Sequence, residues 1–277
     1  MQATDGAGCC INTVVNRAND HNQLMARLQA LEERHQYRIP APVNEPWFEV
    51  REGAVPVLVS APHACMHDRD GVAKMEEEFT GAIAQYLSQS VSCYAIYSTY
   101  QAGEDPNWHT DSAYKRAIAK LHAKAGLGFV IDLHGMLNRH QMGVAVGTMH
   151  QQSCDATEIV SAFETQGFVA TDYAELSSAA EDDFQSANSN HSKHHAHRRL
   201  VVDHPRFTGG VRNHTVTRFA CEQLGVASVQ VELASVARVV HSPPTADWPQ
   251  SYTGEAAIIA DVVRALEMLI TMKSRGH

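Results

Sequence analysis

Three features are missing from this sequence, and each absence excludes a class of protein. No run of eighteen successive apolar residues occurs among the 277 residues, so no membrane-spanning helix is predicted. The N-terminus has no basic segment followed by an apolar core, so we expect no secretory signal. There is no block of lysine and arginine, and the formal net charge is −9, whereas a nucleic-acid surface needs clustered basic side chains. We therefore expect a cytoplasmic protein that acts on a small molecule, with no nucleic-acid or membrane partner.

Paired cysteine motifs are missing as well. The six cysteines include no Cys-x-x-Cys pair, which indicates reduced thiols rather than a disulfide frame. Apolar residues, in contrast, make up 44% of the chain, which is ample for a packed core. A chain of this length has room for one large α/β domain or two small ones.

Strands and helices alternate along the chain, and this order predicts the fold class. Apolar runs typical of buried strands lie at residues 55–60, 92–98, 127–134 and 227–234, and segments with helical spacing lie between them at 77–88, 111–125 and 211–224. Such alternation is typical of an α/β protein whose mostly parallel or mixed sheet lies between two layers of helices, a three-layer sandwich of the phosphorylase/hydrolase-like kind. We interpret residues 1–277 as a single domain of this class.

Two segments lie outside this alternation. Residues 1–40 are interpreted as an N-terminal extension, in which Asp20 is expected to cap an amphipathic helix. Residues 171–206 are polar, so we expect an insertion on the surface there. At the start of the core, residues 47–51 and 55–60 are predicted to pair as a hairpin.

The most informative stretch is LGFVIDLHGM, residues 127–136. Its apolar residues predict a strand buried on both faces, yet it contains Asp132 and His134. An unpaired buried charge is costly, so we expect these two side chains to serve a purpose at the end of the strand. Residues two apart on a strand point to the same face, so one can orient the other.

Two other predicted strands end in the same way. The strand from residue 55 runs into Ala-Pro-His63, and the strand from residue 227 carries Glu232 near its end. In open α/β sheets the ligand crevice lies outside the carboxyl ends of the strands. We therefore expect His63, His134 and Glu232 to meet at one edge of the sheet.

Two histidines and a carboxylate at such an edge fit a hydrolytic zinc site, which uses three protein ligands and leaves one position open. The alternative is that both histidines are buried and bonded to the backbone. Asp132 would orient a ligand histidine or the bound water, or else cap the following turn. Glu232 is the candidate general base, unless it is a surface glutamate on an edge strand.

A set of short motifs follows in a fixed order between about residues 55 and 240. They are SAPHA with His63, EEFT with Glu77, Asp105-Pro-Asn107, DLHG at 132–135, Gly147-Thr148, FTGG at 207–210 and VELA at 231–234. This order resembles the N-formylglutamate amidohydrolase family, which is similar in turn to the zinc carboxypeptidase and aspartoacylase superfamily. The resemblance implies a metal-dependent amidohydrolase in which a histidine, an acid and a second histidine hold the metal and a late glutamate is the base.

The third ligand is where the sequence departs from the carboxypeptidase relatives. Their acidic ligand follows the first histidine by three residues, and here Met66 holds that position. The resemblance implies Glu77 instead, because it stands just before Phe79-Thr80. Asp68, Glu76 and Glu78 remain alternatives, and glutamates here could simply stabilise a helix N-terminus. Zinc is the expected ion, although manganese or iron also suits such ligands.

An amino-acid substrate carries a carboxylate, and arginine is the usual planar partner for it. Arg139 and Arg212 are the candidates, with ordinary solvated arginines as the alternative. Asn107 could donate to a substrate oxygen, or it could belong to a simple turn. We expect hydrolysis of an N-formyl or N-acyl amino acid. The alternatives are hydrolysis of a small peptide or another amide, and a relative that binds a metal or ligand without catalysis.

Overall fold

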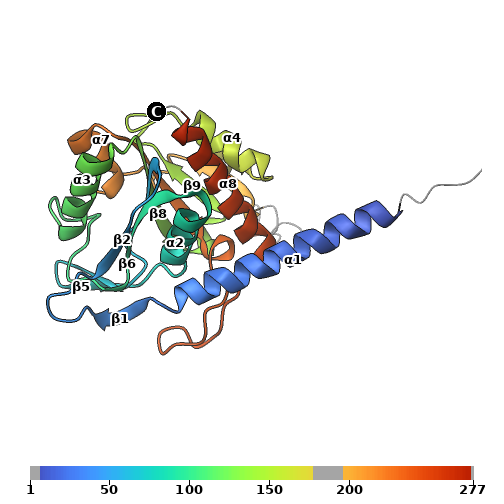
Figure 1. Ribbon diagram of the computed structural model, residues 1–277, viewed down its shortest axis with the longest axis horizontal. Helices are drawn as coiled ribbons and strands as arrows, with labels where there is room; N and C mark the ends of the chain where they lie inside the picture. Colours follow the sequence, from blue (N-terminus) through green and yellow to red (C-terminus); the bar gives the residue numbers. More distant parts are fainter. Residues whose placement is uncertain (1–6, 177–195, 276–277) are drawn as a thin grey trace, which may run out of the picture.

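The computed structural model of the chain describes residues 7–176 and 196–275, with side chains from residue 19 onward (Figure 1). Its central feature is a sheet of eight strands. In spatial order these are β10 (Val169–Ala170), β11 (Arg199–Val202), β9 (Val144–Gly147), β12 (Ala227–Ala234), β8 (Phe129–Met136), β3 (Val55–Ala61), β6 (Cys93–Ser98) and β2 (Phe48–Arg51). Neighbours β12, β8, β3 and β6 are parallel, whereas β9 is antiparallel to β12 and β2 to β6, so the sheet is mixed.

Helices cover both faces of this sheet (Figure 1). One face packs against α2 (Thr80–Val91), α4 (Thr157–Thr165) and α8 (Ala256–Ser274), and the other against α3 (Ala113–Ala125) and α7 (Val216–Leu224). The C-terminal part of α1 (Ala7–Glu32) packs against α2 and α8. On β8, Ile131 and Leu133 belong to the first core and Val130 to the second, as expected for a strand buried on both faces. The predicted α/β three-layer sandwich is therefore confirmed.

Two short sheets lie beside the main one. They are a parallel pair, β1 (Gln36–Pro40) with β7 (Tyr100–Gln101), and an antiparallel hairpin, β4 (His67–Arg69) with β5 (Val72–Lys74). No helix in the described ranges has both the length and the apolar composition to cross a bilayer.

Local signals in the sequence mark the ends of α3 and α7. The hydroxyls of Ser112 and Thr215 accept the backbone N–H groups of the first turns of α3 and α7, which is the usual N-cap bond. Gly126 and Gly225 end the two helices in the left-handed conformation, with φ of 62° and 66°. Ser112 and Gly126 thus mark the ends of α3, and Thr215 and Gly225 mark those of α7.

The predicted hairpin of residues 47–51 and 55–60 is wrong. β2 and β3 do not pair with each other, because both pair with β6, one on each side. The short connection crosses the start of β6, where Ala54 N–H and Val55 N–H donate to the Ser92 carbonyl. A Cβ at Gly53 would lie 2.4 Å from the backbone of Cys93, so only glycine permits this crossing.

Two further expectations need correction. Helix α1 begins at Ala7, so Asp20 lies inside it and does not cap it. The polar segment 171–206 is not all surface insertion, because Arg199–Val202 forms β11 between β9 and β10, with Leu200 and Val201 fully buried. Residues 177–195 of that segment lie outside the described residues.

The C-terminal part of α1 belongs to the main core, while its N-terminal part runs clear of the other elements (Figure 1). Leu28 is fully buried and Leu31 is 8% exposed, and both belong to the core that includes α2 and α8. Residues 24–32 thus anchor the helix to the body of the protein.

Replacing Leu28 with alanine should lower the free energy of unfolding by about 2–5 kcal/mol, because it removes a fully buried side chain and leaves a cavity. Urea unfolding measures this value. Gln23→Ala changes an exposed position on the same helix and should leave the free energy almost unchanged. Equal, small effects of both variants would contradict the packing of α1 described above.

Candidate metal centre

Three neighbouring parallel strands deliver the main residues of the site to one edge of the sheet. His63 follows the end of β3, His134 lies near the end of β8, and Glu232 lies on β12 directly beside His134 in the register. β8 pairs with both other strands. Residues that are about 170 positions apart in the sequence are therefore brought together by the backbone hydrogen bonds of the sheet.

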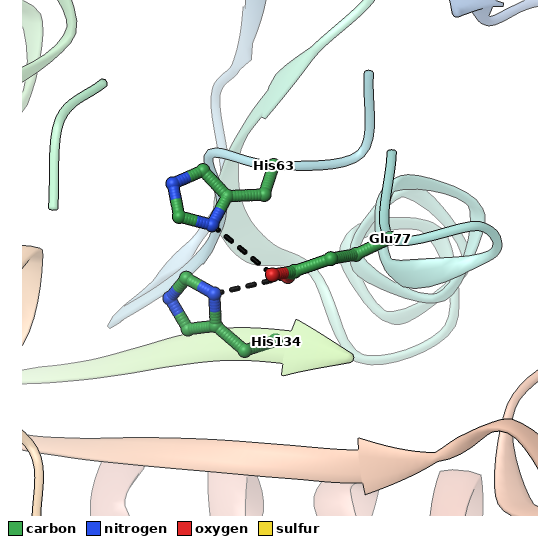
Figure 2. Close-up of side chains that lie close together, drawn as sticks. All are labelled: His63, Glu77 and His134. Carbon is green, nitrogen blue, oxygen red and sulfur yellow. Dashed lines mark hydrogen bonds and ion pairs between the residues drawn. The ribbon is translucent and has the colours of Figure 1, made fainter. Parts of the chain in front are cut away.

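The carboxylate of Glu77 lies between the two histidine rings (Figure 2). Nδ1 of His63 is 3.2 Å from Oε1 of Glu77, and Nδ1 of His134 is 3.0 Å from Oε2. The backbone N–H of Gly135 also donates to Oε2, at 2.9 Å. The ligand atoms of the three side chains all lie within 4.8 Å of one another, which is close enough for each to reach one common ion.

The other nitrogen of each ring faces a buried aspartate. Nε2 of His63 is 2.8 Å from Asp105 Oδ1, and Nε2 of His134 is 3.2 Å from Asp132 Oδ2. Both aspartates are fully buried. Metal-binding histidines usually donate their second ring N–H to a carboxylate, which fixes the ring so that its first nitrogen faces the metal. This arrangement fits a cation bound by both Nδ1 atoms and Glu77.

The charges of the three candidate ligands depend on one another. Burial alone would raise the pKa of Glu77, but the adjacent imidazoles of His134 and His63 hold it well below its usual value. Burial alone would also lower the pKa of His63, yet Glu77 and Asp105 raise it to about 9. The pKa of His134 is raised in the same way by Asp132 and Glu77, against the effect of burial. Without a cation, protonated rings thus neutralise the buried acids.

A second cluster, His63 with His67 and Asp105, also has metal-ligand chemistry. The rings of His63 and His67 stack with their centroids 3.8 Å apart. However, the guanidinium of Arg69 lies 2.7 Å from Asp105 Oδ2, and a fixed positive charge there opposes a metal ion. We therefore assign Asp105 and His67 to the support of His63.

Of the four acids considered for the third ligand, the structure places only Glu77 against both histidines. Glu76 pairs with Arg38 at 3.0 Å. Glu78 accepts the hydroxyl of Ser242 at 2.6 Å, and Asp68 accepts the backbone N–H of Gly71 at 2.7 Å. These three carboxylates are bound elsewhere, so Glu77 is the candidate that the geometry retains.

Glu232 stands beside this cluster with one oxygen available. Its side chain lies on a central strand and the residue is 7% exposed, so it is not on an edge strand. Gln230 donates to Oε1 at 2.6 Å, and no described residue bonds to Oε2. Burial, together with the charge of Glu77, raises the pKa of Glu232 to about 7, although His134 and His63 oppose this. A carboxyl group with such a pKa can accept and return a proton near neutral pH.

These residues line a cavity of about 1190 Å³. Arg139 and Arg212 also line it, both exposed, and neither has an ion-pair partner among the described residues. Asn107 lines it too, but its amide is engaged internally, since Oδ1 accepts Val216 N–H at 2.8 Å and Nδ2 lies 2.7 Å from His134 Nε2. The contacts of these three residues with a substrate remain predictions.

Asp105 and Arg238 are among the residues that the structure adds to those singled out in the sequence. Asp105 was treated as part of a turn motif, although it holds His63. Arg238 is 5% exposed and lines the cavity beside β8, where a Cβ at Gly135 would lie 2.6 Å from its Nε. The glycine of DLHG therefore makes room for this guanidinium. In the sequence, the one signal for Arg238 was that it follows the candidate base Glu232 by six residues.

A buried lysine ties together the two loops beneath the site. Lys115 is 1% exposed, and its Nζ donates to the carbonyls of His109 at 2.7 Å and His214 at 2.5 Å. These carbonyls belong to the loops that carry Asn107 and Thr215. Burial lowers the pKa of Lys115 to about 8, despite the attraction of nearby acids such as Asp132.

Comparison with known proteins supplies no assignment. No family model matches the chain, and no curated protein matches it. The solved structure of a bacteriophage poly-gamma-glutamate hydrolase is similar, with 13% identity, a TM-score of 0.44, and coverage of 83% of this chain and 90% of that one. A metallo-carboxypeptidase from Burkholderia cenocepacia has 11% identity, a TM-score of 0.41, and coverage of 92% and 69%. Both TM-scores are below 0.5, so neither likeness decides the chemistry.

The lowered pKa of Lys115 has a consequence for stability. The folded protein loses this proton near pH 8, whereas the unfolded chain keeps it until about 10.5. The unfolded chain therefore binds more protons in this interval, and the contribution of Lys115 to the free energy of unfolding should increase as the pH rises. Urea unfolding of the wild type and of Lys115→Met between pH 8 and 10 measures it. A difference between the two proteins that does not change with pH would contradict the prediction.

Proposed function

We propose that this protein is a metal-dependent amidohydrolase that uses zinc and acts on N-formyl or N-acyl amino acids. The observation that supports it most directly is the convergence of His63 and His134, each through Nδ1, on the carboxylate of Glu77. Glu232 lies on the adjacent strand at the wall of the same cavity. Three ligands and a nearby base are the components of a hydrolytic metal site.

The chemistry divides between the ion and the protein. A divalent cation in this position supplies Lewis acidity toward the amide carbonyl and lowers the pKa of a water molecule. Glu232 accepts a proton from the attacking water and returns it to the leaving nitrogen, a role that suits its raised pKa. Asp105 and Asp132 hold the histidine rings in place throughout.

The rim of the cavity favours an anionic substrate. Arg139 and Arg212 offer guanidinium groups that no described acid neutralises, and both line the cavity. A guanidinium binds a carboxylate through two parallel hydrogen bonds. We therefore assign to them the α-carboxylate, or an acidic side chain, of the amino-acid part of the substrate.

A second candidate is hydrolysis of a longer amide, such as a small peptide. The cavity volume of about 1190 Å³ supports it, because pockets for drug-sized ligands usually measure about 300–1,000 Å³. An N-formyl amino acid would leave much of this space to water. A screen that compares N-formyl amino acids, N-acyl amino acids and short peptides separates the two candidates by kcat/KM.

Replacing Glu232 with glutamine should lower kcat about 10²- to 10⁴-fold, because the amide cannot shuttle the proton. The metal content should stay at the wild-type value, since Glu232 is not one of the three ligands. Glu222→Gln changes an exposed acid on α7 and should leave kcat unchanged. Binding of the substrate without turnover by the wild type would instead indicate a non-catalytic relative.

Removal of the metal by a chelator should abolish hydrolysis, and added zinc should restore it. His63→Ala and His134→Ala should each prevent stoichiometric metal binding, because each removes one of three ligands. His150→Ala is the matched control, since its side chain is 59% exposed and lies outside the cavity. Metal analysis of the purified variants gives the result. Full activity of the chelator-treated wild type would overturn the proposal.

A further inference from the structure

Glu77 is the one candidate ligand that does not come from the edge of the sheet. It lies in residues 75–79, a connection between β5 and α2 with no regular structure. Its backbone N–H donates to the His63 carbonyl at 2.8 Å, and its own carbonyl accepts from the Thr80 N–H at 3.2 Å and the Thr80 hydroxyl at 2.7 Å. Because no strand or helix holds it, its position depends on such individual bonds.

The backbone of this connection is strained at Phe79, two residues after Glu77. Phe79 has φ of +67°, in the left-handed region, and its ring is buried at 1% exposure. Such a conformation is strained for a bulky residue and persists only where the surroundings determine it. Phe79 also occupies the N-cap position of α2 without a side-chain cap of its own.

The backbone N–H of Phe79 finds its acceptor on a distant helix. Oε1 of Glu32, the last residue of α1, accepts the backbone N–H of Phe79 at 2.5 Å. The hydroxyl of Tyr37 donates to the same oxygen. Glu32 is 5% exposed and does not line the cavity, so it cannot touch a substrate there. Leu28 and Leu31 fix the end of α1 against the core.

Other side chains hold the neighbouring residues of the same connection, and none replaces this bond. Arg38 pairs with the carboxylate of Glu76, and the guanidinium of Arg238 donates to the carbonyl of Glu78. Among the described residues, only Glu32 accepts the N–H of Phe79. The end of α1 is therefore linked through one peptide N–H to the turn that follows Glu77.

We infer that Glu32 is a positioning residue for the metal ligand Glu77, acting through the backbone of Phe79; the inference rests on the proposed metal site. Glu77 follows His63 by fourteen residues, and α1 supplies the restraint that this long connection lacks. Glu32 thus adds a restraint on the carboxylate of Glu77 to those of its direct bonds with His63, Thr80 and Gly135, although it contacts neither ion nor substrate.

The test measures zinc affinity by competition with a coloured chelator, and the visible absorption spectrum of the cobalt(II)-substituted protein. Glu32→Ala should weaken zinc binding about tenfold or more, the range seen when groups that orient a ligand are lost, and should alter the cobalt spectrum. Glu32→Gln should stay close to the wild type, because its amide oxygen can still accept the Phe79 N–H. Glu33→Ala changes an exposed neighbour and should have no effect.

Leu121→Ala separates positioning from simple loss of stability. It removes a buried side chain of α3 from the core on the other face of the sheet, away from α1, so it should destabilise the protein while leaving zinc affinity and the cobalt spectrum unchanged. If Glu32→Ala does not fold, Glu32→Asp takes its place, since its shorter side chain draws the carboxylate away from Phe79.

Two results would overturn the inference. One is wild-type zinc affinity and an unchanged cobalt spectrum in Glu32→Ala or Glu32→Asp. The other is an equal loss of affinity in Leu121→Ala, which would make the effect one of stability alone. A wild type that binds neither zinc nor cobalt would refute the proposed metal site itself, and this outcome is distinct because it precedes any comparison of variants.

Discussion

The candidate site depends on the compensation of charge among two imidazoles, the carboxylate of Glu77 and the two buried aspartates behind the rings. His63, His134 and Glu77 are each costly to bury alone, and they persist in the interior because their charges compensate at distances near 3 Å. A divalent cation could take over this compensation by replacing the ring protons, since a metal ligand must be deprotonated. Asp105 and Asp132, behind the rings, hold both rings in the same orientation with ring protons or with a metal ion in the site.

The sheet and the loops contribute to the site with different precision. His134 and Glu232 lie opposite each other in a continuous ladder of eight paired residues, so their separation is set by backbone hydrogen bonds. Glu77 and Asp105 come from connections, and each relies on several individual bonds with distant partners. Sites built on strands are held more precisely than sites built on loops. In this protein, buried polar side chains hold the loops: Glu32 from α1, Lys115 from α3 and Arg238 from the segment before α8.

The sequence predicted the parts of the fold that local pattern determines. β8 and β12 match their predicted apolar runs closely, and the polar residues at the ends of these runs indeed lie at one edge of the sheet. The hairpin failed because apolar alternation identifies a strand but not its partner. β11 was missed because its short apolar run follows a long polar segment. Asp105 and Glu32 could not be assigned, since their importance arises only from contacts between segments remote in the sequence.

The position of β12 has a consequence for synthesis on the ribosome. It is the last strand of the sheet along the chain, yet it lies between β8 and β9 and joins two groups of strands that do not otherwise pair. Until residues 227–234 emerge, β8 has no partner on one side, and the unpaired N–H and C=O groups of a strand with apolar side chains are a hazard for aggregation. The strand that closes this edge also carries Glu232. A nascent chain therefore acquires its candidate base in the same event that completes its sheet.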